Sequence, residues 1–304
     1  MKQFRRILTI VLLFVFLSSS AVLACQSFQR QESEASLQNA KELAALPDTP
    51  AIPSQAQPLQ AESGLTDALL HSLQTTPETL QEAVRVLTDT PQLIARSRDI
   101  TSWLPVLDDA NAGSLLSIDI GALQATSPDV LGWFLIPGTS ISYPLLQGED
   151  NTHYLNFTWD NRESFVGSIF MECTNSSSLS DFNTIIYGHN LGDTHMFSTL
   201  PSYGLQSHWS EHPYIYIVTE NGAFRYRIFA AYQTAVDSNT FRLRFQGPEP
   251  KQAYLDESIA QSVIDTGITP TVNDRILTLS TCVRGQQDSR WIVQALLEGQ
   301  LSAA

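Results

Sequence analysis

From residue 130 onward, short runs of apolar and β-branched residues alternate with polar positions, which is the pattern of half-buried β-strands. Gly, Pro, Asn and Asp separate these runs, and Glu220-Asn221-Gly222 has the composition of a hairpin turn. The pattern predicts eight strands, at residues 131–136, 141–146, 168–172, 184–187, 214–219, 222–234, 276–281 and 291–297. Eight short strands at this spacing indicate a closed or nearly closed β-barrel, so we predict a fold of the mainly β class.

Helical patterns mark further segments around the predicted barrel. One, at residues 115–127, precedes the strands, and two, at 194–200 and 251–264, interrupt them. Ahead of all of these, residues 65–98 contain helix-start signals and apolar residues at helical spacing, which predict two short amphipathic helices. We therefore expect peripheral helices around the barrel and an N-terminal helical segment before it.

The N-terminus has the pattern of a targeting segment. Three basic residues precede an apolar run over residues 7–17, and mostly small residues follow as far as Cys25. This order is typical of a secretory leader. Two outcomes stay open: residues 7–25 approach the roughly 20 residues that cross a bilayer and fit an uncleaved anchor, whereas Val22-Leu23-Ala24-Cys25 resembles a lipidation motif. Either outcome attaches the chain to the cell membrane and places the remaining residues on its extracellular face.

Composition then divides the chain into four parts. A signal or anchor at residues 1–25 is followed by a Gln-, Glu- and Pro-rich spacer at residues 26–64, which has little apolar surface to bury. Residues 65–112 are predicted to form a helical pre-domain. Residues 113–304 contain the strand pattern and are predicted to form the domain that carries the chemistry.

Charge and cysteine content narrow the function classes. The 304-residue chain has a formal net charge of −14, which disfavours nucleic-acid binding because phosphate recognition needs a basic surface. Of the 3 cysteines, Cys25 lies in the leader, so the mature domain has at most one disulfide, between Cys173 and Cys282. A chain so poor in cysteine is not a disulfide scaffold, and we expect two free thiols.

A histidine motif raises the question of a metal site. His208-Trp209-Ser210-Glu211-His212 has the letters of an inverted zincin motif, which requires both histidines on one helix face. Pro213 follows at once and a strand begins at Tyr214, so the segment fits a turn better than a metal-binding helix. We predict no metal site.

Candidate chemistry lies at the ends of predicted strands. Cys282 follows strand 276–281, and Arg290 begins the strand that can pair back against it. A guanidinium beside a thiol favours the thiolate and can stabilise an oxyanion. His189 ends an earlier strand and is the side chain whose pKa suits proton transfer to a leaving group. The alternatives are a buried, inert Cys282 and Arg284 in place of Arg290.

These segments resemble a known family. Tyr187-Gly188-His189-Asn190, Thr278-Leu279-Ser280-Thr281-Cys282, and Arg290 followed by Trp291-Ile292-Val293 are similar to the three catalytic blocks of the sortases. Residues 130–147 resemble the opening strands of that fold, and residues 148–184 resemble class B sortases in particular. The resemblance extends in order over about residues 115–297, and three ordered motifs are far more specific than any one of them.

The resemblance implies an eight-stranded sortase-type barrel and an extracytoplasmic cysteine transpeptidase without a cofactor. Cys282 would attack the carbonyl of a Thr in a sorting signal of the Asn-Pro-x-Thr or Leu-Pro-x-Thr-Gly type and form a thioacyl enzyme. His189 would protonate the leaving amine, and Arg290 would bind the oxyanion. Its partners would be secreted proteins with a C-terminal sorting signal and, as acceptor, an amine of a cell-wall precursor or a pilin.

The resemblance also implies residues that bind the peptide. Asn151 and Leu155 match groove residues of the family, and Tyr187 and Ser280 match residues that line the pocket in class B members. Position 283 departs from the pattern, because many class B enzymes have an acidic residue where this chain has Val283.

Two other functions remain as alternatives on the sequence alone. A cysteine peptidase would use the same nucleophile but transfer the acyl group to water. A peptide-binding domain would keep the fold without catalysis, although the joint presence of Cys282, His189 and Arg290 argues against it.

Overall fold

The computed structural model describes residues 2–46 and 104–302, and it describes side chains from residue 18 onward. The helices predicted at residues 65–98 lie outside the described residues. So do the side chains of residues 1–17, which hold most of the apolar run of the predicted leader.

The predicted β-barrel is confirmed. Its eight strands are β2 (Val130–Leu135), β3 (Ser142–Leu146), β4 (Ile169–Met171), β5 (Asn183–Tyr187), β6 (Tyr214–Thr219), β7 (Gly222–Ala235), β8 (Ile276–Val283) and β9 (Gln286–Leu301). A two-residue strand, β1 (Val106–Leu107), pairs in parallel with the end of β9. Successive side chains point to opposite faces of a strand, and in β2, β3, β4 and β8 most residues of both faces are buried.

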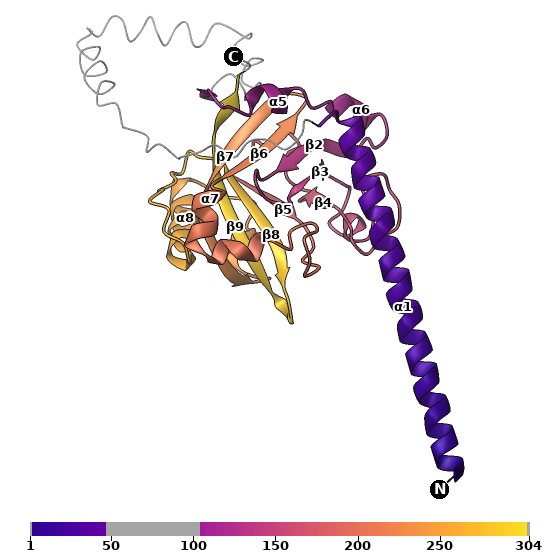
Figure 1. Cartoon of the computed structure of the whole chain (residues 1–304). Helices are drawn as coiled ribbons and strands as arrows, with labels where there is room; N and C mark the ends of the chain where they lie inside the picture. Colours follow the sequence, from indigo (N-terminus) through magenta and orange to yellow (C-terminus); the bar gives the residue numbers. More distant parts are fainter. Residues whose placement is uncertain (1, 47–103, 303–304) are drawn as a thin grey trace, which may run out of the picture. The chain divides into compact units, whose positions relative to one another are not determined.

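The sheet is mixed and closes on itself. The strand order is β1-β9-β7-β6-β2-β3-β4-β5-β8, and β8 also pairs with β9 to complete the barrel (Figure 1). The pairs β3–β4 and β5–β8 are parallel, and the other pairs within the barrel are antiparallel. The parallel pair β5–β8 joins two strands that are far apart in the chain, and it determines where the chemistry lies.

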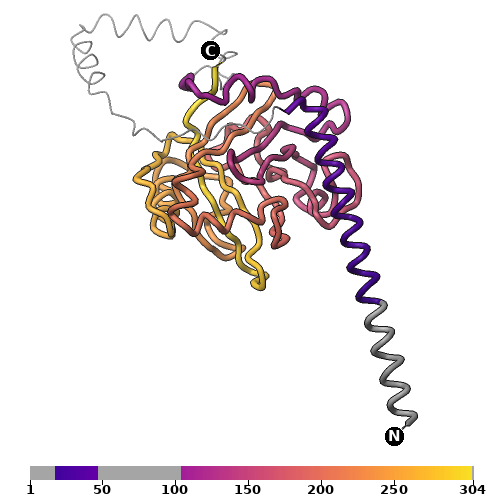
Figure 2. The backbone as a smooth tube through the Cα atoms, in the orientation of Figure 1, coloured from indigo at the N-terminus to yellow at the C-terminus, as the bar shows by residue number. Residues whose placement is uncertain are grey.

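β8 and β9 are longer than the sequence pattern predicts. They form one hairpin whose turn contains Gly285 at a φ of 77°, a conformation that Gly adopts at little steric cost. In the backbone trace this hairpin is the yellow loop that extends beyond its neighbouring strands (Figure 2). The hairpin continues past Cys282, so this residue lies within a paired strand.

Apart from α1 and α8, the described helices are short. The full set of described helices is α1 (Lys2–Leu43), α5 (Ala112–Leu116), α6 (Ile120–Gln124), α7 (Gln206–Glu211) and α8 (Pro248–Gln261), with 3-10 turns η2 (His153–Leu155), η3 (Leu200–Gly204) and η4 (Asn239–Phe241). The helix predicted at residues 115–127 is divided into α5 and α6. The Asp119 carboxylate accepts a hydrogen bond of 2.9 Å from the Ala122 N–H and starts the second helix.

The helix predicted at residues 194–200 is wrong. That segment consists of bends, turns and an isolated bridge at Met196, and helical structure begins only at its last residue, Leu200, in η3, where Pro201 occupies the first turn. His208 lies on α7, so the interpretation of residues 208–212 as a turn is also wrong. α7 ends at Glu211, two residues before Pro213, which cannot continue a helix.

A buried polar network attaches α8 to the strands that lead to the candidate site. The Gln294 Nε2 donates hydrogen bonds to the Tyr254 hydroxyl at 2.6 Å and to Thr278 Oγ1 at 3.1 Å. Thr278 Oγ1 in turn donates to Asn183 Oδ1 at 2.7 Å. Thr278, Asn183 and Gln294 are each 0% exposed, and buried polar groups with these partners hold β5, β8 and β9 in one arrangement.

The second half of α1 contacts the barrel domain, although it lies in the segment predicted as a spacer. Ser33 and Ser164 share a hydrogen bond of 2.7 Å between their hydroxyls. The Trp159 indole N–H donates to the carbonyl of Ser36 at 2.9 Å. Among the residues whose side chains are described, none of the helices has the length and apolar character needed to cross a membrane.

Candidate active site

Strand register brings three candidate residues to one edge of the sheet. In the parallel pair β5–β8, Tyr187 lies opposite Ser280, so His189, just after β5, and Cys282, near the end of β8, lie at the same end of the pair. In the antiparallel pair β8–β9, Cys282 lies opposite Arg290. Directly opposed residues of antiparallel strands have side chains on the same face, which places the thiol and the guanidinium together.

Hydrogen bonds tie the two strand ends to each other. Thr281 Oγ1 donates to the carbonyl of Gly188 at 2.7 Å, and the Asn190 Nδ2 donates to the carbonyl of Cys282 at 3.0 Å. Thr281 is only 2% exposed. These contacts flank His189 on one strand and Cys282 on the other, and they fix the spacing between them.

Replacing Thr281 with Val is expected to lower the free energy of unfolding by about 1–3 kcal/mol, because the buried carbonyl of Gly188 loses its hydroxyl partner. Val has nearly the same shape as Thr, so the change creates no cavity. Urea denaturation measures the effect, and Thr281→Ser, which keeps the hydroxyl, is the matched control. An unfolding midpoint equal to that of the native chain would show that this hydrogen bond does not hold the strand ends.

A backbone carbonyl orients His189. The His189 Nε2 lies 2.7 Å from the carbonyl oxygen of Leu155. A carbonyl can only accept, so Nε2 carries a proton, and in the neutral ring Nδ1 is the nitrogen free to exchange one. The family resemblance assigned Leu155 to the peptide groove, and the contact in the structure is from its main chain to the histidine.

Gly167 makes this contact possible. Its φ is 64°, in the left-handed region, and a Cβ there would lie 2.8 Å from the Leu155 carbonyl oxygen and 3.0 Å from the His189 ring. The absence of a side chain at Gly167 therefore lets the histidine and the carbonyl approach each other. The strand pattern did not single out this glycine, and its signal is visible only in three dimensions.

Cys282 is an exposed free thiol, and Cys173 is also free. The register shifts between Cys282 and Val283, so a bulge follows the cysteine directly. Bulges change the direction of a strand and often accompany active sites. An exposed thiol at such a position is accessible to a substrate.

The two candidate arginines differ in their surroundings. Arg290 Nη1 donates to the carbonyls of Gln287 at 2.8 Å and Ser289 at 3.0 Å, which holds the guanidinium within its own turn. Arg284 lies instead against Gly192, where its guanidinium occupies the space that a Cβ would need. The register with Cys282 favours Arg290 over Arg284.

The four residues proposed to bind peptide have different environments. Asn151 and Tyr187 converge on one carboxylate, that of Glu172, with hydrogen bonds of 2.7 and 2.9 Å. Ser280 is 2% exposed, so its side chain is covered in this structure. Glu172 was missed at the sequence level, although an acidic residue at the end of an apolar strand is a signal that could have found it.

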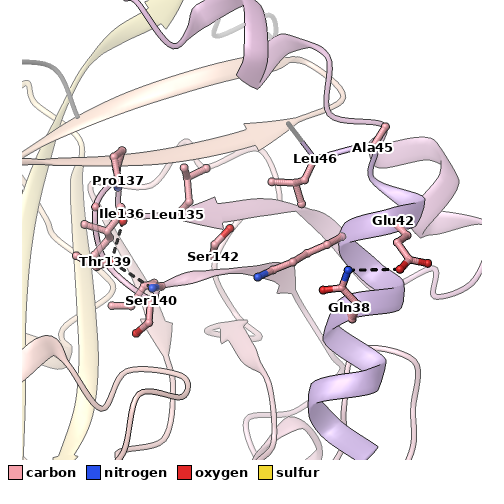
Figure 3. A pocket seen from close by; sticks show the side chains of 13 residues that line it. Gln38, Glu42, Ala45, Leu46, Leu135, Ile136, Pro137, Thr139, Ser140 and Ser142 are labelled. Atoms are coloured by element: carbon pink, nitrogen blue, oxygen red, sulfur yellow. Dashed lines mark hydrogen bonds between the residues drawn. The ribbon is translucent and has the colours of Figure 1, made fainter. Parts of the chain in front are cut away.

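Two cavities lie near the elements described so far. One of about 410 Å³ is lined by Asn190 and Val283, which neighbour His189 and Cys282 in the sequence, and by Asp193, Arg284 and Trp291, among others. A second, of about 650 Å³, lies between the end of α1 and the turn from β2 to β3 (Figure 3). Gln38 and other residues at the end of α1 form one wall of the second cavity, and Cys282, His189 and Arg290 are absent from its lining.

The histidine motif has a local structural role. The rings of His208 and His212 are 4.7 Å apart, and His212 Nδ1 donates to the carbonyl of Pro137 at 2.9 Å. Burial, followed by the charge of His212, lowers the pKa of His208. Within the described parts of the chain, no three His, Cys, Asp or Glu side chains gather as a metal site requires.

Comparisons of this chain with family models and with known proteins all match the same family. A family model of the sortase domain matches residues 134–298. Sortase B of Staphylococcus aureus is 39% identical over 161 residues, which cover 53% of this chain and 66% of that protein. Sortase B of Listeria monocytogenes is 32% identical over 205 residues, which cover 63% of this chain and 83% of that protein.

The structural match agrees with the sequence matches. The crystal structure of Staphylococcus aureus sortase B aligns with a TM-score of 0.57 at 36% identity, over 59% of this chain and 86% of that one. By sequence, the match spans just under two thirds of the Staphylococcus aureus protein.

Proposed function

This chain belongs to the sortase family, and we propose that it is a class B cysteine transpeptidase that cleaves a sorting signal after Thr and transfers the acyl group to an amine. The observation that carries the proposal is the register that places Cys282 beside Arg290 and, through the β5–β8 pair, at the same edge as His189. Both relatives compared by sequence are sortases of the B type.

The first half-reaction forms a thioester. The Cys282 thiolate attacks the Thr carbonyl carbon, and the carbonyl electrons move onto oxygen, where the Arg290 guanidinium stabilises the negative charge. When the tetrahedral intermediate collapses, the C–N bond breaks. The leaving amine then takes a proton from His189.

The second half-reaction reverses these roles. An incoming amine loses a proton to His189 and attacks the thioester carbon, and the C–S bond breaks to regenerate the Cys282 thiolate. No oxidant or cofactor is needed, because one amide bond is exchanged for another. The Leu155 carbonyl supports both halves, because it holds the imidazole in a single orientation.

We propose that the donors are secreted proteins with a C-terminal sorting signal of the Asn-Pro-x-Thr or Leu-Pro-x-Thr-Gly type. The acceptor is an amine of a cell-wall precursor or of a pilin. Residues 7–25 attach the enzyme to the cell membrane and keep the catalytic domain on the extracellular face. Asn151, Leu155 and Tyr187 are proposed to contact the bound peptide, whereas the side chain of Ser280 is covered and does not contact it in this arrangement.

Mass spectrometry of the protein with candidate substrates tests this function. The full-length chain is incubated with peptides of both types and an excess of diglycine. A thioacyl adduct on Cys282 and a diglycine-capped product are expected. Hydrolysed peptide without capped product would favour a cysteine peptidase. If no adduct forms while Cys282 still reacts with an alkylating reagent, the domain is a peptide binder and the proposed function is wrong.

A further inference from the structure

Glu172 is a buried carboxylate directly after β4, close to the candidate groove. It is 7% exposed. Its oxygens accept hydrogen bonds from Asn151, from the Tyr187 hydroxyl, and from both the N–H and the hydroxyl of Thr174, at 2.7, 2.9, 3.2 and 3.0 Å. Among the described residues, no basic side chain forms an ion pair with it. Neighbouring dipoles thus stabilise this anion and occupy its lone pairs.

Glu172 is ionised at neutral pH. Burial raises the pKa of Glu172, but the hydrogen bonds from Asn151, Thr174 and Tyr187 together outweigh burial, and the pKa lies below its usual value of 4.5. A permanently charged acceptor determines the direction of every hydrogen bond made to it. Glu172 therefore fixes the orientation of the groups around it.

The first group it orients is the Tyr187 hydroxyl. Burial and the negative charge of Glu172 raise the pKa of Tyr187, so the hydroxyl keeps its proton and donates it to Glu172. Only the lone pairs of the oxygen remain for another partner. The ring packs against Phe170 with centroids 5.4 Å apart, which limits rotation of the side chain. Tyr187 is therefore fixed as a hydrogen-bond acceptor.

The second group is the amide of Asn151. Its Oδ1 accepts from the backbone N–H of Cys173 at 2.8 Å, and its Nδ2 donates to Glu172 at 2.7 Å. A backbone N–H can only donate and a carboxylate can only accept, so these two partners allow a single amide orientation. The carboxylate and the Cys173 N–H therefore hold this amide from both sides, and loss of the carboxylate would leave the N–H of Cys173 alone to orient it.

Tyr187 lies beside the chemistry, and Asn151 shares its carboxylate partner. Tyr187 is opposite Ser280 in the β5–β8 pair and stands two residues before His189. The positive charge of Arg290 partly offsets the effect of Glu172 on Tyr187, although the pKa of the hydroxyl stays raised overall. Glu172 thus orients a hydroxyl group that lies next to the residues proposed to act on the peptide.

We propose that Glu172 is a positioning residue that determines peptide selectivity: it holds Tyr187 as an acceptor and Asn151 in one orientation, so that this side of the groove favours peptides presenting N–H donors. The inference rests on the proposed function, because the peptide is the acyl donor of the transpeptidation. Glu172 does not touch the reacting atoms. It acts through Tyr187 and Asn151.

Glu172→Gln tests the proposal, because it keeps the shape and replaces one acceptor oxygen with an NH2 group. With an Asn-Pro-x-Thr peptide and the full-length protein, KM is expected to rise about tenfold, as for one lost hydrogen bond, while kcat stays within about twofold. Tyr187→Phe is expected to have a similar effect. The double variant is expected to be no worse than Glu172→Gln alone, because that change already removes the contact that Tyr187→Phe removes. Glu220→Gln, at an exposed turn, is the matched control and is expected to match the native enzyme.

Three results would overturn the proposal. They are an unchanged KM in a folded Glu172→Gln variant, single-variant effects that multiply in the double variant, and a loss confined to kcat. If Glu172→Gln does not fold, the KM of Tyr187→Phe alone tests the proposal, since this variant removes only the hydroxyl that contacts Glu172. Calorimetric peptide binding in a Cys282→Ala background repeats the comparison without turnover. An inactive native enzyme would therefore count against the proposed function alone.

Discussion

Cys282→Ala is expected to abolish formation of the thioacyl enzyme and to reduce kcat/KM by a factor on the order of 10⁴, because no other group at this edge can supply the nucleophile. Cys282 is exposed, so the alanine variant is expected to fold with an unchanged melting temperature. Peptide affinity is also expected to persist, since the groove residues remain. Single-turnover mass spectrometry, thermal denaturation and calorimetry measure the three quantities.

Cys173→Ala is the control for this experiment, because it removes the other thiol of the domain. It is expected to retain the acyl adduct at Cys282. An adduct that persists in Cys282→Ala, or that moves to Cys173, would show that the nucleophile has been assigned wrongly. Equal loss of peptide binding and turnover would indicate a structural role for Cys282.

Gly167→Ala is expected to be the most damaging single methyl addition near the site. The new Cβ would lie 2.7 Å from the carbonyl oxygen of Tyr154 and 2.8 Å from that of Leu155, and backbone atoms cannot rotate away as a side chain can. Left-handed strain adds roughly 1–2 kcal/mol to this clash. We expect the melting temperature to fall by roughly 5–10 °C. We also expect kcat to fall at least tenfold, because the Leu155 carbonyl that orients His189 must move.

Gly267→Ala separates the effect of left-handed backbone strain from the effect of the steric clash. Gly267 has a φ of 65°, nearly that of Gly167, but no atom lies within 4 Å of its added Cβ. This variant therefore carries the backbone strain without the clash, and it lies outside the candidate site. It is expected to lose some stability and to keep the native kcat. If both variants lose the same stability and both keep kcat, the approach of Leu155 to His189 is not important for activity.

The sequence predicted the barrel well because its strands follow a simple period. The strand predicted at residues 214–219 has the same bounds as β6 (Tyr214–Thr219), since a hairpin turn and Pro213 delimit it. The position of His189 after the end of β5 was also predictable, whereas the strand predicted to end before Cys282 continues to Val283. The meeting of these two residues follows from a parallel pairing that no local pattern encodes, and here the resemblance to a family supplied what periodicity could not.

Other features were not predictable, for identifiable reasons. The contacts of α1 combine the hydroxyl groups of Ser33 and Ser36 with apolar residues near the end of the helix, Leu37, Ala40 and Leu43. This short apolar stretch lies within a Gln-, Glu- and Ser-rich segment, whose composition favours a spacer. The helical turns near residue 200 begin where Pro201 permits, later than the apolar spacing suggested. Glu172 was hidden because its importance depends on Asn151 and Tyr187, which are distant in the sequence.

The β5–β8 pairing also affects how the protein becomes active. His189 and Cys282 are separated by β6, β7 and α8, and they become neighbours only when β8 inserts between β5 and β9. Contacts so distant in sequence form late and slowly during folding. An unfinished or unfolded chain therefore carries a cysteine without its histidine or arginine. The proposed catalytic residues are therefore assembled only when the last hairpin closes the barrel.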